Sequence, residues 1–299
     1  MTNSQAKASA LGVDGGGSRC RLLLERGDGA RFAAEVGSAN ASSDFAGACA
    51  ELSTGLTEVA QAAGLTVADL AGVPAFLGLA GVNSAALAAK VAAQLPLNAV
   101  HVEEDTRIAL RAAIGAADGV VAHCGTGSFL GLQRAGRMRF VGGWGLTLGD
   151  EASAGWLGRR ALSVSLQAAD GLVAVSGLSD QILAEFEDAA GVMAWAVEAR
   201  PADFGRFAPF VTTAAAAGDA LALGLMQEGA DYIAKTTYAL GWRVGQALCL
   251  TGGIGPHYAA LLPDDMQAAL QPAVSTPLEA ALDMAQALGR DGFARGALL

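Results

Sequence analysis

The feature that most constrains this chain is a pattern of strand, glycine loop, strand, turn and strand that occurs twice. In the first copy, apolar runs at 10–13 and 20–25 flank a glycine loop, and a third strand covers 31–36. In the second copy, strands at 119–124 and 129–133 flank another glycine loop, and a third strand covers 137–141. Helical segments follow both copies, so we interpret the chain as an internal duplication of one meander-plus-helix unit.

The first loop reads Asp14-Gly15-Gly16-Gly17-Ser18. Three successive glycines leave several backbone N–H groups free to converge on an anion. The carboxylate of Asp14 is a hard oxygen ligand suited to a magnesium ion that rides on phosphates, and the hydroxyl of Ser18 is a further donor. For this loop alone, a glycine-rich hairpin turn without a ligand is the alternative interpretation.

The second loop reads Gly125-Thr126-Gly127-Ser128. A dinucleotide-binding fingerprint should open a helix, whereas this loop leads into another strand, so the Rossmann interpretation fails. The chain also contains no Walker sequence Gly-x-x-x-x-Gly-Lys-Ser/Thr. We therefore expect two hairpin loops that face one another across a cleft and hold one polyphosphate from two sides. A third glycine turn, 251–257, follows a predicted strand at 247–250, where ligands of α/β sheets usually bind.

Apolar periodicity predicts the remaining elements. Strands are expected at 75–79 and 97–102. Helices are expected at 44–63, 84–94, 106–117, 152–167, 219–246 and 278–288. Ser43 is a plausible N-cap for the first of these helices.

The composition limits the function and the compartment. A net charge of −10 argues against a nucleic-acid partner, because that affinity rests on clustered Lys and Arg. The 4 cysteines are scattered, without the spacing of a zinc site or a disulfide framework, which favours a reducing cytoplasm. The polar start of the chain and the lack of an 18-residue apolar run predict neither a signal peptide nor a membrane span.

Taken in order and spacing, the three glycine loops resemble the nucleotide site of the sugar kinase, actin and heat-shock ATPase superfamily. Four further segments resemble the bacterial glucosamine and N-acetylglucosamine kinases, a group with a BadF/BadG-type ATPase domain. These segments are Gly-Ser-Ala-Asn40, Gly-Leu-Ala-Gly81, Asp105-x-x-x-Ala109 and Gly-Asp150-Glu-x-Ser-Ala-Gly155, and residues 204–219 look similar to the glucosamine kinase branch. The resemblance covers nearly the whole chain.

This resemblance implies an α/β fold of two duplicated actin-like, ribonuclease H-like ATPase domains with an interdomain cleft. The N-terminal domain would comprise residues 1–106, completed by a C-terminal helix at 278–299. The C-terminal domain would comprise residues 107–277 and carry a helical insertion. We expect the cleft to close on ATP, Mg²⁺ and a small-molecule sugar, which would exclude water.

The resemblance also implies a role for each matched residue. Asp14 would hold Mg²⁺, and Asp105 would accept the proton of the sugar hydroxyl. The phosphates would be bound by Gly15, Gly16, Gly17, Ser18, Gly125, Thr126, Gly127 and Ser128, and the adenosine by Gly252, Gly253 and Ile254. The sugar would contact Asn40, Gly81, Asp105, Thr126 and Asp150.

Two of these assignments have structural alternatives. Asp105 follows Glu103 and Glu104, so the trio could be a solvated acidic strand end, and either glutamate could assist Asp105. Asp150 could serve only as a helix N-cap. The three histidines, His101, His123 and His257, are interpreted as packed or solvated rather than as ligands.

The activity implied is ATP-dependent phosphorylation of the 6-hydroxyl of an amino sugar by a cytoplasmic homodimer, with no membrane partner. Glucosamine is the favoured substrate and N-acetylglucosamine the alternative. An ATPase activator of the BadF type is a weaker alternative, because those activators bridge an iron–sulfur cluster with paired cysteines that this chain lacks. A sugar-sensing repressor would need a helix-turn-helix, for which the segment before the first strand leaves no room.

Overall fold

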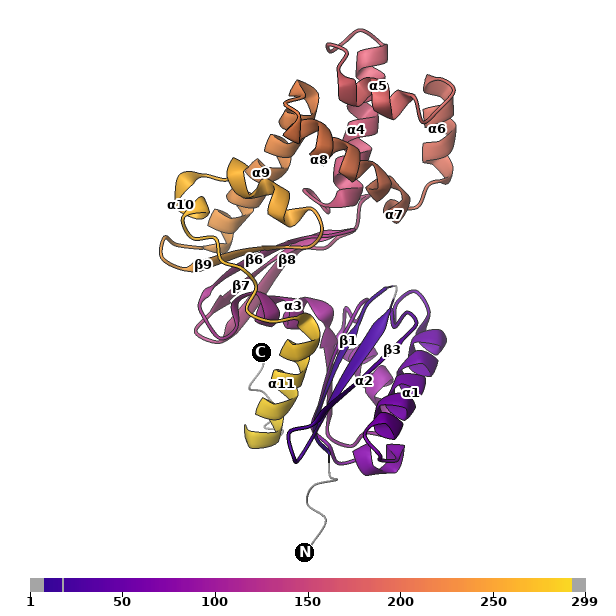
Figure 1. The fold of residues 1–299 in the computed structure, drawn as a ribbon, viewed down its shortest axis with the longest axis vertical. Helices are drawn as coiled ribbons and strands as arrows, with labels where there is room; N and C mark the ends of the chain where they lie inside the picture. The colour runs from indigo at the N-terminus through magenta and orange to yellow at the C-terminus, as the bar shows by residue number, and fades with distance from the viewer. Residues whose placement is uncertain (1–7, 18, 292–299) are drawn as a thin grey trace, which may run out of the picture. The chain divides into compact units, whose positions relative to one another are not determined.

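The computed structural model describes residues 8–17 and 19–291. Ser18 and the stretch 292–299 of the expected C-terminal helix lie outside the described residues. The described chain divides into two compact units, each with its own β-sheet and helices (Figure 1). Unit 1 comprises the described residues up to Gly115 together with those from Val274 onward, and unit 2 runs from Ala116 to Ala273.

Unit 1 is built on a five-stranded sheet of order β3-β2-β1-β4-β5. Its strands are β1 (Ala8–Gly15), β2 (Cys20–Arg26), β3 (Arg31–Val36), β4 (Ala75–Leu79) and β5 (Val100–Glu104). The first three form an antiparallel meander, while β4 and β5 run parallel to β1. Gly15 pairs with Leu79, and Leu79 pairs with Glu104, so three strands end at one edge of this sheet.

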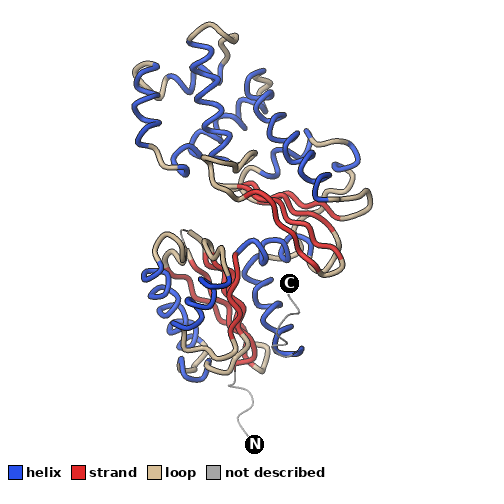
Figure 2. The backbone as a smooth tube through the Cα atoms, turned by 180° about the vertical axis from the view of Figure 1, so that it is seen from behind, coloured by secondary structure: helices blue, strands red, loops and turns tan. Residues whose placement is uncertain are grey.

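Helices cover both faces of this sheet (Figure 2). One face packs against α1 (Phe45–Ala62) and α2 (Ala85–Gln94), with the short helix η2 (Val67–Leu70) between them. The other face packs against α3 (Asp105–Ile114) and α11 (Pro277–Asp291). Strand alternation explains the division, because Leu11 enters the first core cluster and its neighbour Ala10 enters the second.

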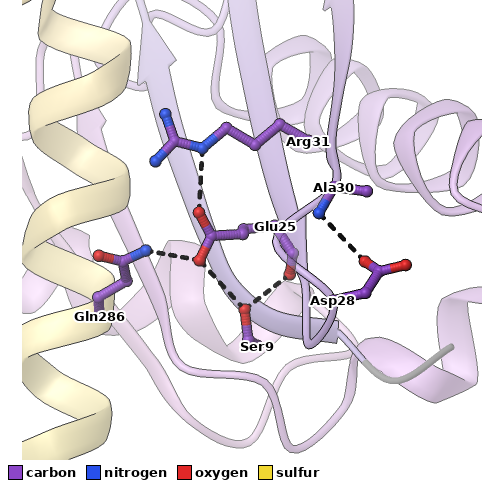
Figure 3. A network of polar contacts seen from close by, with 6 residues as sticks. All are labelled: Ser9, Glu25, Asp28, Ala30, Arg31 and Gln286. Carbon is purple, nitrogen blue, oxygen red and sulfur yellow. Dashed lines mark hydrogen bonds and ion pairs between the residues drawn. The ribbon is translucent and has the colours of Figure 1, made fainter. Parts of the chain in front are cut away.

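Helix α11 is joined to the N-terminal strands although it lies at the other end of the chain. A Cβ at Gly12 would overlap the backbone nitrogen of Leu282, so this glycine permits the helix to lie directly on β1. The Gln286 Nε2 donates to Glu25 Oε1 at 2.7 Å, while Arg31 Nε pairs with Glu25 Oε2 at 3.0 Å (Figure 3). Unit 1 therefore needs both ends of the described chain.

Unit 2 repeats the meander in a four-stranded sheet of order β8-β7-β6-β9. Its strands are β6 (Gly119–Cys124), β7 (Ser128–Arg134), β8 (Arg137–Gly142) and β9 (Ala247–Thr251). Helices α4 (Ala154–Ala169) and α9 (Ala220–Leu240) share the core of this unit. The remaining helical segments are α5 (Gly177–Leu183), α6 (Ala189–Glu198), α7 (Pro201–Phe204), η3 (Gly205–Phe207), α8 (Ala208–Ala216), η4 (Gly255–Leu261) and α10 (Asp264–Gln267).

Local predictions were wrong at three places. The side chain that caps α1 is Asp44, which accepts from the backbone nitrogen of Gly47, rather than Ser43. Strand β5 covers 100–104 rather than 97–102, because its pairing with β4 continues to Glu104. Helix α9 ends at Leu240 rather than near 246, because Gly241 adopts the left-handed conformation that terminates helices.

Within the described part of the chain, no single helix has both the length and the apolar character to cross a membrane. The segments 202–216 and 220–240 reach that length and composition only as a pair, and they are bent by 110° at their junction. The cysteines Cys20, Cys49, Cys124 and Cys249 are all free thiols.

Candidate active site

The first glycine loop of unit 1 lies beside two other predicted site segments. The Ala39 nitrogen donates to the carbonyl of Gly16 at 3.1 Å, and the Ala80 nitrogen donates to the carbonyl of Gly15 at 2.7 Å. These bonds place the segments that carry Asn40 and Gly81 next to the loop. The structure thus brings together three of the predicted site segments at the carboxyl ends of β1 and β4.

Asn40 uses its two amide atoms differently. Its Oδ1 accepts from the backbone nitrogens of Ser42 and Ser43, at 3.1 and 3.2 Å, which fixes the side chain. Its Nδ2 lies 4.0 Å from the position that a Cβ would take at Gly17. A Cβ at Gly81, where φ is +77°, would overlap Asn40 Oδ1, so a glycine is required there. The amide N–H groups of Asn40 are therefore directed toward the glycine loop.

Asp14 forms an ion pair across the hairpin. The Arg21 Nη2 lies 2.5 Å from Asp14 Oδ2, and the two residues are register partners in β1 and β2. The Asp14 side chain is 13% exposed. Among the described residues, no group of three or more His, Cys, Asp and Glu is arranged to hold a metal ion by itself. One carboxylate fits a magnesium ion that is carried on phosphates and keeps most of its water, which is how Mg²⁺ commonly binds.

Asp105 is the first residue of α3 and is half-buried. Burial raises the pKa of its carboxyl to about 6, with further contributions from the negative charges of Glu104 and Asp14. Hydrogen bonds from its own backbone nitrogen and that of Thr106 act in the opposite direction. Asp105 therefore lies within electrostatic reach of Asp14, so the two predicted acidic groups of unit 1 belong to one region.

The three consecutive acidic residues differ in their surroundings. Glu103 lies within ion-pair distance of two side chains, His101 and Arg107. Glu104 is exposed, and its Oε2 accepts from the Thr106 hydroxyl at 3.1 Å. Asp105 is therefore the acid of the trio that combines burial with a raised pKa, and such a carboxylate is a candidate general base.

The second glycine loop is held by the start of α4. The nitrogens of Ala154 and Gly155 donate to the carbonyls of Gly125 and Thr126, at 2.8 and 3.3 Å. These bonds turn the carbonyls of Gly125 and Thr126 toward the helix. The Gly125 nitrogen donates to the Gly127 carbonyl at 2.9 Å, so a ligand would use the N–H groups of Thr126 and Gly127. The Ser128 hydroxyl is buried and donates to the Glu151 carbonyl at 2.6 Å, so it holds the loop that carries Asp150.

Asp150 adopts a backbone conformation that is uncommon outside glycine. Its φ is +60° and its residue is 9% exposed. The N-cap of α4 is Ser153, which accepts from the Trp156 nitrogen, so the interpretation of Asp150 as a cap was wrong. A Cβ at Gly127 would lie 2.7 Å from Asp150 Oδ2. Asp150 is thus held in a strained conformation against the second glycine loop, as functional residues often are.

The third glycine turn is interlocked with the second loop. A Cβ at Gly252, where φ is +80°, would overlap the carbonyl oxygen of Cys124. The Ile254 nitrogen donates to the same carbonyl at 3.0 Å, and the Ile254 side chain lies in the core of unit 2. Any contact of this turn with adenosine would therefore use the backbone of Gly252 and Gly253.

Sequence reasoning missed His123 as a part of this arrangement. Its Nδ1 lies 3.1 Å from the Thr251 hydroxyl, and its Nε2 would lie 2.9 Å from a Cβ at Gly125. Burial lowers the pKa of the imidazole, so His123 is neutral at pH 7. The side chain links the strand ends before the second and third glycine turns. Its place immediately before Cys124 and the second glycine loop was the available signal.

Comparison with known proteins identifies the family of this chain. Residues 11–277 match the model of the BadF/BadG/BcrA/BcrD ATPase family. The chain belongs to this family. It is 29% identical over 275 residues to glucosamine kinase GspK from Vibrio cholerae serotype O1, across 91% of this chain and 94% of the relative.

Solved structures give the same relationship. A Chromobacterium violaceum protein, provisionally named an N-acetylglucosamine kinase, is 31% identical, with a TM-score of 0.83 over 94% of this chain and 100% of that one. A Streptomyces griseus ROK family glucokinase, crystallised with glucose and AMPPNP, has a TM-score of 0.54 at 18% identity, over 95% and 100% of the two chains. The latter likeness concerns the fold alone. The predicted α/β class with two actin-like halves is confirmed.

Proposed function

We propose that this protein is an ATP-dependent kinase that phosphorylates the 6-hydroxyl of glucosamine. The family match, and the similarity over nine-tenths of the chain to a protein named glucosamine kinase, support this activity. The observation that carries the proposal is Asp105, a half-buried carboxyl with a pKa of about 6 in the region of Asp14. Such a group is ionised at pH 7 and is basic enough to accept a proton.

In the proposed reaction, Asp105 accepts the proton of the 6-hydroxyl while that oxygen forms a bond to the γ-phosphorus. The bond from the γ-phosphorus to the β–γ bridging oxygen breaks, and ADP leaves with the electron pair. Backbone N–H groups of Gly17, Thr126 and Gly127 would orient the phosphates, because those of Gly16 and Gly125 donate within their own loops. Asp14 would hold Mg²⁺ through water, and that ion would neutralise phosphate charge. Asn40, Thr126 and Asp150 would bind sugar hydroxyls.

The charge around Asp105 favours glucosamine over its acetylated form. After burial, the charges of Glu104 and Asp14 raise the pKa of Asp105, so these carboxylates would add negative potential beside a bound sugar. The ammonium group of glucosamine is stabilised in such a field, whereas the neutral acetamido group of N-acetylglucosamine is not. N-Acetylglucosamine is the second candidate, because the similar Chromobacterium protein bears that name.

We further propose that the enzyme acts in the cytoplasm as a homodimer, without nucleic-acid or membrane partners. Four free thiols and a net charge of −10 support the compartment and the absence of a nucleic-acid partner. Light scattering of the purified protein tests the dimer.

The activity test is a coupled ADP-release assay over glucosamine, N-acetylglucosamine, mannosamine and glucose, with the phosphorylated position read by NMR. Glucosamine should give the highest kcat/KM and a 6-phosphate product. The substitution Asp105→Asn should lower kcat by about 10²–10⁴-fold, the usual contribution of a general base. Turnover of the variant near that of the wild type would reject the proposed function.

The same variant has an internal control for folding. Since the pKa of Asp105 is raised in the folded state, its stabilising contribution is present at acidic pH and is lost as pH rises through about 6. The ionised carboxylate therefore destabilises the fold at pH 7, and Asp105→Asn should melt no lower than the wild type. A lower melting temperature would show that its loss of activity reflects damage to the fold.

A further inference from the structure

Two nitrogen-bearing side chains approach the carboxylate of Glu103. His101 Nε2 lies 2.9 Å from Glu103 Oε1, and Arg107 Nε lies 2.6 Å from Glu103 Oε2. The Glu103 side chain is only 17% exposed. Ion pairs that are partly buried are screened by salt much less than surface pairs. Each carboxylate oxygen of Glu103 therefore lies beside a nitrogen of one of these side chains.

The pair between Glu103 and Arg107 spans the candidate general base. Glu103 lies in β5, which ends at Glu104, and Arg107 lies in the first turn of α3, which begins at Asp105. No loop residue separates the strand from the helix. The direction of the Asp105 side chain is consequently set by the angle at which the first turn of α3 leaves the sheet, and this ion pair joins the two sides of that turn.

Packing on the sheet also fixes the first turn of α3. Gly78 is the register partner of Glu103 in β4, and a Cβ there would lie 2.6 Å from Ile108 Cδ1. Ile108 of α3 can therefore lie directly on the sheet. The ring of His101 lies against buried Phe76, with 5.2 Å between the ring centroids. The histidine is thus itself held where it contacts Glu103.

We propose that Glu103 is a positioning residue that, clamped by Arg107 and His101, orients Asp105 toward the sugar hydroxyl. This inference rests on the proposed kinase function and answers which glutamate assists the base. Glu103 touches neither substrate nor reacting atoms in this role. Without the clamp, the Asp105 carboxylate samples more directions, and a displacement of about 1 Å can lower a rate by about 10²-fold.

The test uses Glu103→Gln, Arg107→Gln and the double variant. Each single variant should lower kcat about 10- to 100-fold, with KM for ATP and for the sugar nearly unchanged. The double variant should be no slower than the slower single, because both substitutions remove the same interaction. Additive losses, or a kcat equal to that of the wild type in both single variants, would overturn the proposal.

Two control variants separate a positioning role from a general effect on the fold. Arg111→Gln alters an arginine one turn further along α3, which donates to the Gly115 carbonyl at 3.1 Å, and should leave kcat unchanged. Arg107→Lys keeps the positive charge and should retain most of the activity. If Glu103→Gln does not fold, the Arg107 variants alone decide between the outcomes.

A second readout is the ratio of ADP released to sugar phosphate formed. A misdirected base should raise this ratio, because water then competes with the sugar hydroxyl, whereas a purely structural role would leave the ratio unchanged. Asp105→Asn separates the two failures. An active Asp105→Asn would reject the proposed function, whereas an inactive Asp105→Asn beside unaffected Glu103 and Arg107 variants would reject only the positioning role.

Discussion

The two glycine hairpins share a backbone design but differ in charge. The comparison concerns the last residue pair but one at the loop end of each hairpin. In the first hairpin Asp14 lies opposite Arg21, and in the second His123 lies opposite Phe129. The first of these is an ion pair, whereas the second is a pair of stacked rings with centroids 5.1 Å apart. The same step of the repeated unit thus carries a carboxylate in unit 1 and a neutral imidazole in unit 2.

Side chains beside these two positions differ in charge in the same way. In unit 2, burial lowers the pKa of His123 and raises the pKa of the Cys124 thiol to about 12, so both side chains are uncharged at pH 7. In unit 1, the carboxyls of Asp14 and Asp105 interact electrostatically. Both halves thus share the hairpin backbone, whereas the last strand residue but one is an ionisable carboxylate in unit 1 and a neutral ring in unit 2.

The most direct test of the difference between the two hairpins is to substitute Asp14 and His123, which occupy equivalent positions. Asp14→Asn should lower kcat/KM for ATP by about 10²–10³-fold, because it removes a carboxylate from the charge-stabilising part of the site. His123→Phe, which retains a ring that can stack on Phe129, should cost less than about tenfold. Calorimetry should show that Asp14→Asn weakens Mg·ATP binding far more than sugar binding. Equal losses at both positions would contradict the division.

The next largest expected effect is a loss of stability when the contact between the second and third glycine turns is disturbed. Gly252→Ala places a Cβ against the Cys124 carbonyl at a φ of +80°, which should destabilise the protein by roughly 1–3 kcal/mol. Gly253→Ala is a matched control, because a Cβ there would meet no atom within 4 Å. Thermal unfolding and nucleotide titration measure both variants. Equal melting temperatures would show that the turn adapts without cost.

The smallest expected effect is a shift of the pH profile when a negative charge beside Asp105 is removed. Since the pKa of Asp105 is raised to about 6, kcat/KM for the sugar should fall as pH decreases through 6. Glu104→Gln removes one of the negative charges that raise this pKa, so the acid limb should move to lower pH by less than about one unit. Glu58→Gln, on the exposed side of α1, should leave the profile unchanged. An upward shift in Glu104→Gln would contradict the electrostatic assignment.

The sequence predicted the hairpins and the α/β class because their signals are local. Alternating apolar residues and glycine loops specify a strand pair without reference to the rest of the chain. The end of β5 was harder to predict, because Glu103 and Glu104 look like loop residues until β4 is placed beside them. Adjacent capping candidates such as Ser43 and Asp44 differ too little for sequence to choose between them.

The candidate site was predictable as a set of residues but not as an arrangement. The left-handed backbone of Asp150 depends on surrounding contacts, and no residue pattern nearby announces it. The clamp on Glu103 needs a histidine two residues earlier and an arginine four residues later, on two different kinds of element. Spacing alone would have suggested an ordinary solvated acidic stretch.

The attachment of α11 to β1 has a consequence for the order in which the halves become native on the ribosome. Unit 2 is one continuous stretch and can collapse as soon as it has emerged, whereas the first-made strands must wait for Leu282 and its neighbours. The half that is translated first is thus the half that matures last, and during that interval the part of its sheet face that α11 later covers stays exposed.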